Sequence, residues 1–267
     1  MASQPFPAVA VREYQVDSDA IGATRLSDTE IHVWHQSLAL GIPEVETLRR
    51  LLSPDELRRA ERFRFEPNRK EFIVCRGTLR RLLGSYLQVP AAELRFAYSE
   101  YGRPSLMADT KETKLDFNVS HSGEAALLAF GCGRTIGIDV EEVRRDFGTS
   151  EIAERFFSRA ERAALRELSP DQRYEAFFRC WTRKEAFIKA LGEGLSHPLD
   201  QFDVSLAPGA PAALLATRPD AQEVNRWKLW DIEVPSGYAA ALAAKSNGKS
   251  IRPGYPGIRN SQEYLQS

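Results

Sequence analysis

The sequence has few cysteines, no long apolar run and almost no net charge. Its three cysteines, Cys75, Cys132 and Cys180, are an odd number without short-range pairing, which indicates buried thiols in a reducing compartment rather than disulfides or a zinc cluster. No stretch approaches the roughly 20 apolar residues of a membrane span, and the N-terminus lacks a signal-peptide core. We therefore expect a cytoplasmic protein that is not embedded in a membrane.

The charge balance excludes a chain-wide attraction to polyanions. The formal net charge is −1 over 267 residues, so no overall basic field draws the protein to nucleic acid or to an anionic membrane. Any anion site must be local, and nine basic residues lie between Arg58 and Arg81. Such runs are usually solvated helix faces, but this one could also receive a polyanionic ligand.

Turn, capping and periodicity signals predict alternating helices and strands. Residues 1–29 have little pattern and are expected to form an extension, and the tail at 247–267 is expected to be mobile. Ser53 and Glu56 form a capping box that predicts a helix start. Further helices are expected at about 68–87, 150–167 and 171–191. Strands are expected at 31–34, 94–98, 115–119, 125–130, 135–141, 201–206, 227–234 and 238–243. The strands at 125–130 and 135–141 are expected to form a hairpin.

Four residue types recur at one fixed offset. Ser53, Glu56, Phe72 and Cys75 are matched 105 residues later by residues of the same types, at 158, 161, 177 and 180. Chance explains four matches as well as duplication does, because S-x-x-E recurs at capped helices. A duplication would mean two similar α+β halves with a cleft between them.

A short strand carries two neighbouring acids. Alternation over residues 135–141 places Gly137, Asp139 and Glu141 on one face of the strand. Like charges so close repel each other unless a cation or a basic group lies between them. Oxygen ligands without nearby His or Cys favour Mg²⁺ or Ca²⁺, and the alternative is the solvated face of an edge strand.

A third acid lies within the apolar stripe of a predicted helix. Glu185 falls between Trp181 and Ile188 on that stripe, where a buried carboxylate needs a partner. Lys189, four residues on, projects beside it. The two interpretations are an ordinary exposed Glu–Lys pair and a buried functional acid, and the aromatic surroundings favour the second.

Small polar residues end the strand before the acidic one. Asn118, Ser120, His121 and Gly123 suit phosphate binding through side chains and backbone amides, although a polar turn with a capping histidine fits equally well. Arg103, in a Tyr-Gly-Arg-Pro turn, is a further candidate for an anion contact.

In this order, these segments resemble the 4'-phosphopantetheinyl transferases, specifically the Sfp-type group. The resemblance covers about residues 30–243, and its motifs are FNVSHSG at 117–123, GIDVE at 137–141, RFFS at 155–158 and WTRKEAFIKALGEGLSHPLDQF at 181–202. It implies an α+β fold of two similar subdomains related by a pseudo-twofold axis, each a small antiparallel sheet packed with helices. We place the subdomains at residues 30–124 and 125–246.

The resemblance also implies roles for individual residues. Asp139, Glu141 and Glu185 match metal ligands that hold Mg²⁺, or Mn²⁺ as the alternative, against the pyrophosphate of coenzyme A. The remaining matches are contacts to coenzyme A: Lys184 and Lys189 at the pyrophosphate, Ser120 and His121, with Asn118 beside them, at the nucleotide phosphates, and Arg59 and Arg103 on the adenosine 3'-phosphate side. Arg103 stands where lysine is frequent, which keeps the charge but changes its geometry.

The implied reaction is a transfer to a protein. A serine of an apo acyl or peptidyl carrier protein would attack the β-phosphate of coenzyme A and release adenosine 3',5'-bisphosphate, with Glu185 as general base and Lys189 at the leaving phosphate. Fatty acid, polyketide and nonribosomal peptide carriers all fit, and a monomer is expected. The rivals are a metal-dependent phosphodiesterase and a catalytically silent carrier-binding module.

Overall fold

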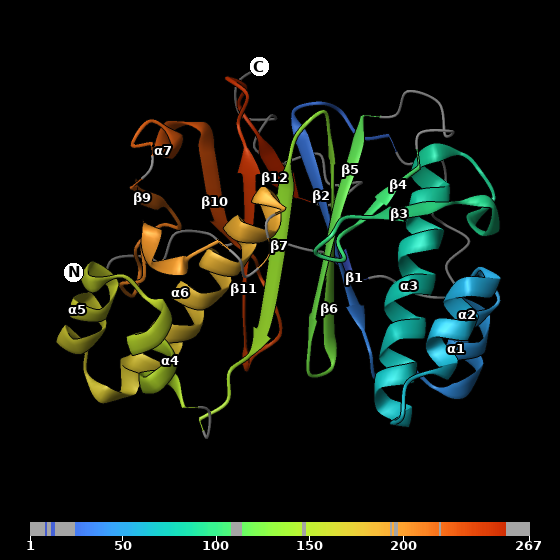
Figure 1. Ribbon diagram of the computed structural model, residues 1–267, viewed down its shortest axis with the longest axis horizontal. Helices are drawn as coiled ribbons and strands as arrows, with labels where there is room; N and C mark the ends of the chain where they lie inside the picture. The colour runs from blue at the N-terminus through green and yellow to red at the C-terminus, as the bar shows by residue number, and fades with distance from the viewer. Residues whose placement is uncertain are drawn as a thin grey trace, which may run out of the picture.

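The protein folds into two α+β halves whose sheets meet at the centre. The computed structural model describes Val9 and residues 12–13, 25–107, 114–145, 148–192, 194, 197–218 and 220–254. Figure 1 shows the two sheets side by side, with α1 to α3 on one side and α4 to α6 on the other. Among the described residues, no helix is long and apolar enough to cross a membrane.

The sheet of the first half is antiparallel at its centre. β2 (Glu30–Ser37) pairs with β6 (Ala125–Cys132), and β6 forms a hairpin with β5 (Leu115–Ser122). Two short segments, β1 (Arg12–Glu13) and β12 (Arg252–Gly254), pair in parallel with the other edge of β2. The strand order is therefore β1-β2-β6-β5, with β12 also on β2.

Three helices and a small hairpin complete the first half. The helices are α1 (Ile42–Arg49), α2 (Pro54–Glu61) and the long α3 (Glu66–Leu87), each with a proline in its first turn, where the missing N–H costs no hydrogen bond. Apolar residues of α3, such as Leu82, pack against Phe130 and Leu128 of β6. The 3₁₀ turn η1 (Ala91–Glu93) leads into the hairpin of β3 (Phe96–Tyr98) and β4 (Pro104–Leu106).

The second half has the same plan. β7 (Ile136–Glu142) pairs with β11 (Tyr238–Lys245), and β11 pairs with β10 (Trp227–Asp231), all antiparallel. Its helices are α4 (Thr149–Phe156), α5 (Arg159–Glu167) and the long α6 (Pro170–Leu191). The shorter elements are η3 (Leu199–Gln201), β8 (Phe202–Val204), β9 (Leu214–Thr217) and α7 (Glu223–Arg226).

Matched buried ion pairs relate the two halves. Each half has a capping box, at Ser53 and at Ser158, before a short helix, and then a helix of 22 residues. The glutamate of each box is 2% exposed and pairs with a base from the long helix. Glu56 pairs with Arg80 at 2.6 Å, and Glu161 pairs with Lys184 at 2.9 Å. The predicted fold of two similar subdomains is confirmed, and the recurring residues mark equivalent positions in them.

The apolar faces of the two sheets pack against each other. Ile31 and Val33 of β2 lie in one buried cluster with Ile138 and Val140 of β7 and with Leu242 of β11. All five side chains are 0% exposed. The sheets therefore share one core, while α3 and α6 cover their outer faces.

Three sequence predictions need correction. The hairpin expected between residues 125–130 and 135–141 is wrong, because β6 pairs with β5 and β2 and belongs to the first sheet. The boundary between the halves consequently follows β6 rather than preceding it at residue 124. The helix expected at 150–167 is interrupted at Phe157, which has extended backbone, and Ser158 caps a new helix.

Both chain ends contribute strands, although they were expected to be an extension and a mobile tail. The backbone N–H of Val9 donates to Asp231 O at 2.9 Å, and Glu233 N donates to Val9 O at 2.8 Å. Residues 252–254 pair with β2, so the prediction of mobility is wrong for them. The rest of the predicted extension before residue 25 and the tail after residue 254 lie outside the described residues.

We predict that His32 makes stability depend on pH. Its ring is 5% exposed, and Nδ1 lies 2.8 Å from the Tyr86 hydroxyl, which also accepts from Trp34 Nε1 at 3.0 Å. Burial lowers the pKa of His32 to about 4, against a smaller opposing effect of Glu30. The unfolded chain therefore binds more protons than the folded one between about pH 4 and 6.5, so stability falls as pH decreases through that range.

The measurement is the free energy of unfolding of the native protein and of His32→Gln at pH 7 and pH 5. The His32 contribution should cost the native protein about 2 kcal/mol over this interval and be missing in the variant. The difference between the two proteins in the pH dependence of the unfolding free energy isolates the contribution of His32, because the buried carboxylates titrate in both. Equal pH dependence in the two proteins would contradict the prediction.

Candidate active site

Three carboxylates from the second half converge where α6 crosses β7. Asp139 and Glu141 alternate with buried Val140 on β7, so both side chains leave the same face of the strand. Glu185 reaches this face from α6 and interacts electrostatically with both of them. The structure thus brings together the three acids that the sequence singled out.

Gly137 allows α6 to approach this closely. A Cβ atom at Gly137 would lie 2.1 Å from Ala186 O and 2.4 Å from Ala190 N. The backbone of α6 therefore rests directly on the backbone of β7, at the residues that follow Glu185 and Lys189. The space that this glycine leaves on the acidic face of β7 is therefore filled by the helix.

Side chains of β5 join the first half to the second at this point. Asn118 Oδ1 accepts from Ile138 N at 2.9 Å, and Ser122 Oγ accepts from Glu142 N at 3.1 Å. Between them, Ser120 Oγ lies 3.4 Å from Val140 N. Alternate side chains of β5 thus take the place of a neighbouring strand for the outer edge of β7. We call this contact the β5–β7 seam.

The seam residues also hold the acids and Lys189. Ser120 Oγ donates to Asp139 Oδ1 at 2.9 Å, and Ser122 Oγ donates to Glu141 Oε2 at 2.9 Å. Lys189 Nζ donates to Asp139 Oδ1 at 2.6 Å and to Ser120 Oγ at 2.8 Å. Lys189 is therefore the positive charge of the cluster, and it bridges the two halves of the protein.

Burial raises the pKa of all three carboxyl groups, and repulsion by neighbouring acids adds to this for Glu141 and Glu185. Burial is the main cause of the raised pKa of Asp139, and the Lys189 ammonium and the Ser120 hydroxyl oppose it. The pKa of Glu141 is raised by burial and by the charge of Asp139. Burial, together with the charges of Asp139 and Glu141, raises the pKa of Glu185 to about 7. One lysine does not balance three acids, so the cluster favours additional positive charge.

The donor chemistry of the cluster suits a hard divalent cation. Asp139 Oδ2 and Glu185 Oε1 are buried and have no hydrogen-bond partner, which is costly unless a cation or a proton compensates. All three acids offer oxygen ligands of the kind that Mg²⁺ prefers. Within the described part of the chain, no three His, Cys, Asp or Glu side chains already stand in the arrangement of a metal site. The residues fit the ion chemically, but they are not pre-arranged around it.

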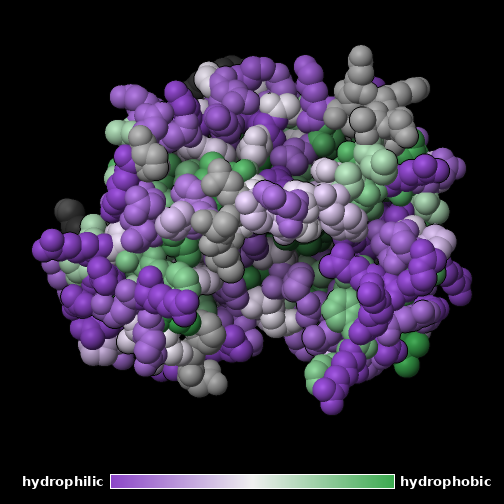
Figure 2. Space-filling view, viewed as in Figure 1, coloured by the Kyte–Doolittle hydropathy of each residue, from purple (hydrophilic) through white to green (hydrophobic). Residues whose placement is uncertain are grey.

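Two cavities lie along β5, and the smaller one reaches Lys189 of the cluster. One, of about 320 Å³, is lined by Arg59, Phe72, Arg76 and His121 among others. The other, of about 260 Å³, is lined by Arg103, Asn118, Lys189 and Tyr101 among others. Figure 2 shows the surface hollowed between the two halves at the lower edge of the view.

The larger cavity combines cationic and aromatic side chains. The guanidinium of Arg59 lies 5.2 Å from the centre of the Phe72 ring and 5.9 Å from that of the Tyr98 ring. His121 Nδ1 lies 2.9 Å from Glu71 Oε1, and the side chain of His121 is 46% exposed. Arginines beside aromatic rings can receive a phosphate and a nucleobase together.

Sequence reasoning did not select Arg76 for the site. Arg76 is 8% exposed, lines the larger cavity, and its Nη1 has no hydrogen-bond partner. Burial lowers the pKa of Arg76. It was one of nine basic residues with no feature to set it apart. Ser122, the partner of Glu141, was also missed, although it alternates with Asn118 and Ser120 along one strand.

The structure does not bring Lys184 to this site. Lys184 is 0% exposed, and its Nζ donates to Leu199 O at 2.6 Å and Phe202 O at 2.7 Å besides pairing with Glu161. It cannot reach a ligand at the carboxylates, so its predicted contact with pyrophosphate is not retained. Lys184 and Lys189 are five positions apart, which places them on different sides of α6.

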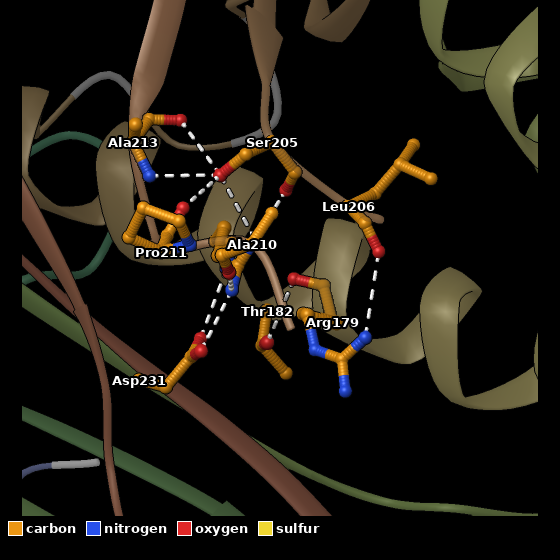
Figure 3. A network of polar contacts seen from close by, with 9 residues as sticks. Arg179, Thr182, Ser205, Leu206, Ala210, Pro211, Ala213 and Asp231 are labelled. Carbon is orange, nitrogen blue, oxygen red and sulfur yellow. Dashed lines mark hydrogen bonds and ion pairs between the residues drawn. The ribbon is translucent and has the colours of Figure 1, made fainter. Parts of the chain in front are cut away.

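The neighbouring Arg183 is likewise structural. It is 0% exposed, and it donates to both carboxylate oxygens of Asp231, at 2.9 and 2.7 Å. The same guanidinium donates to Ser205 Oγ, and Figure 3 shows Ser205 in turn surrounded by the backbone of Pro211 and Ala213. This network fixes the side of α6 that faces away from the carboxylates.

Comparison with known proteins gives consistent matches to one family. Residues 135–243 match the 4'-phosphopantetheinyl transferase superfamily, and residues 42–132 match the family described as 4'-phosphopantetheinyl transferase, N-terminal. The two matched segments meet between β6 and β7, where the structure divides the halves.

Individual relatives cover most of the chain. The chain is 38% identical over 225 residues to the 4'-phosphopantetheinyl transferase HetI of Nostoc sp., covering 84% of this chain and 91% of that protein. It is 32% identical over 201 residues to the 4'-phosphopantetheinyl transferase Sfp of Bacillus subtilis, covering 75% and 85%. The holo-[acyl-carrier-protein] synthase of Thermotoga maritima matches with a TM-score of 0.35 and 27% identity, covering 42% of this chain and 63% of that one.

We predict that Gly137→Ala destabilises the protein. The added methyl would meet the backbone of Ala186 and Ala190, which cannot rotate away, so α6 must shift. The expected loss is about 2 kcal/mol of unfolding free energy, measured by chemical denaturation. Gly254→Ala is the matched control, because a Cβ there meets nothing within 4 Å. Stability equal to that of the control would show that α6 does not rest on β7 as described.

Proposed function

The chain belongs to the 4'-phosphopantetheinyl transferase superfamily and transfers the phosphopantetheine group of coenzyme A to carrier proteins, and we propose that the carboxylate cluster on β7 and α6 is its catalytic centre. The observation that supports this assignment is the convergence of Asp139, Glu141 and Glu185 beside Lys189 at the β5–β7 seam. The acids of the second half and the basic cavity of the first half meet there.

Asp139, Glu141 and Glu185 are the residues that would hold Mg²⁺, with Mn²⁺ as the alternative. The buried oxygens Asp139 Oδ2 and Glu185 Oε1, which lack partners, support this assignment. When bound, the ion would neutralise charge on the pyrophosphate of coenzyme A.

The chain's own residues handle the proton and the leaving group. Glu185, with a pKa raised to about 7, is suited to accept the proton of the carrier serine near neutral pH. Lys189 lies between Asp139 and Ser120, where its ammonium can stabilise the departing phosphate. Glu185 therefore has two proposed roles, as ligand and as base.

The cavity of the first half is proposed to bind the nucleotide part of coenzyme A. Arg59 and Arg76 supply positive charge, and the rings of Phe72 and Tyr98 offer apolar surface for a base. His121, next to Ser120, contributes a donor toward the phosphates. Adenosine 3',5'-bisphosphate would leave from this side, so the serine of the apo acyl or peptidyl carrier would enter from the opposite side.

The direct test mixes the protein, coenzyme A, Mg²⁺ and a panel of apo fatty acid, polyketide and peptidyl carriers. We expect at least one carrier to gain roughly 340 Da, the mass of the phosphopantetheine group, by mass spectrometry. Glu185→Gln should lower the rate by about 100-fold or more, and Glu167→Gln, an exposed acid on α5, is the matched control. No mass gain with any carrier would refute the proposal, and coenzyme A breakdown without carrier would favour a phosphodiesterase.

The metal assignment has a separate readout. Mg²⁺ should raise the melting temperature of the native protein, because binding to the folded state stabilises it, and it should restore activity after treatment with a chelator. Asp139→Asn should abolish the thermal shift, whereas Glu167→Gln should retain it. A thermal shift that survives Asp139→Asn would place the ion elsewhere.

A further inference from the structure

Arg103 connects four elements from both halves at the end of α6. Its Nη1 donates to Lys189 O at 2.7 Å and lies 3.4 Å from Ala190 O. Its Nη2 donates to both carboxylate oxygens of Asp116, at 3.2 and 3.1 Å, and to Ile136 O at 3.2 Å. The guanidinium thus extends from the β3–β4 connection to β5, β7 and α6, and both of its terminal nitrogens are engaged.

The contacts on α6 have a physical basis in the helix end. The last four carbonyl groups of a helix lack partners within it and carry the negative end of its dipole. In α6, Gly192 N satisfies Ile188 O, and Arg103 satisfies the carbonyl of Lys189. Gly192 has φ +80, which ends the helix in the left-handed region. Arg103 therefore acts as a capping group supplied by the opposite half.

The carbonyl group that Arg103 binds is that of Lys189, the lysine of the carboxylate cluster. The backbone of Lys189 is held by Arg103, while its side chain reaches Asp139 and Ser120. Gly137 sets the distance of α6 from β7, and Arg103 sets where α6 ends along that strand. Together they determine the position from which the Lys189 ammonium extends.

The geometry suits an arginine. Four acceptor oxygens, on Lys189, Asp116 and Ile136, surround one planar group, and its fork of N–H donors meets all of them at once. The ammonium group of a lysine is a compact charge, and it lacks the planar fork of donors that matches these acceptors. Asp116 orients the fork from β5 while remaining partly exposed.

We propose that Arg103 is a positioning residue, which places Lys189 for the transfer by capping α6, rather than a ligand of the adenosine 3'-phosphate. This inference rests on the proposed function of Lys189. It replaces the role that the family resemblance gave to Arg103, and it explains why an arginine stands where lysine is frequent.

The first experiment compares Arg103→Lys and Asp116→Asn with the native protein and with Arg95→Lys, an exposed arginine that precedes the same hairpin. Both test variants should lower kcat by about 10-fold, because a small displacement of a catalytic group is costly, while KM for coenzyme A changes less than twofold. The double variant should be no worse than the poorer single one, since both changes release the same contact. Unchanged kcat in Arg103→Lys would overturn the proposal.

The second experiment separates positioning from phosphate binding. The quantity measured is kcat/KM for coenzyme A divided by kcat/KM for 3'-dephospho-coenzyme A. Arg103→Lys and Asp116→Asn should leave this ratio at the native value. A ratio that moves toward one in Arg103→Lys would identify Arg103 as a 3'-phosphate ligand and overturn the proposal. Arg59→Gln, in the nucleotide cavity, is expected to lower the ratio and tests the proposed nucleotide site independently.

A third measurement does not depend on activity. Hydrogen exchange of the backbone amides in the last turn of α6 should be faster in Arg103→Lys than in the native protein and in Arg95→Lys. Faster exchange supports the cap even if the native protein transfers nothing, in which case only the proposed function fails. Equal exchange in all three proteins would refute the cap itself.

Discussion

The site depends on which groups accept hydrogen bonds from the edge of β7 that faces the first half. β7 is the edge strand of the second sheet, and the N–H groups on its outer side need acceptors. Asn118, Ser120 and Ser122 provide them from β5, so the halves are held together by side chains rather than by a continuous ladder. Two of these acceptors also donate to acids, Ser120 to Asp139 and Ser122 to Glu141. The contact that joins the halves therefore also orients the carboxylates, and a change in one cannot leave the other intact.

The duplicated plan shows how equivalent positions acquired different tasks. Each half buries a capping glutamate and neutralises it with a base from its long helix, Arg80 in one and Lys184 in the other. These buried pairs fix the short helices against the long ones. The second half also places Glu185 and Lys189 on the face of its long helix toward the seam. The first half contributes the cavity with its arginines and aromatic rings.

Short-range patterns predicted the long helices, most of the longer strands and the three acids, because period and capping are local properties. Glu185 could be selected because an acid within an apolar stripe must meet a partner. The pairing of β6 could not be predicted, since a run of small apolar residues fits either sheet. Lys184 and Lys189 are basic residues of the same predicted helix, and only the packing of α6 shows that Lys184 is internal. The break at Phe157 was predictable, because Ser158 and Glu161 repeat the motif that marked the earlier helix. Arg103 was recognised by its charge, but its acceptors are carbonyl groups, which no side-chain pattern reveals.

The pairing of Val9 has a consequence for synthesis of the chain. Its backbone partners, Asp231 and Glu233, are among the last described residues to be made. The outer edge of β2 is likewise shared by segments from both ends, at Arg12–Glu13 and Arg252–Gly254. The first half can form its helices and the β2-β6-β5 sheet once residue 132 has been made, but that edge stays incomplete until residues 252–254 follow. During this interval it is open to pairing with other nascent chains. Pairing of both segments with β2 therefore covers this edge and leaves it less open to other chains.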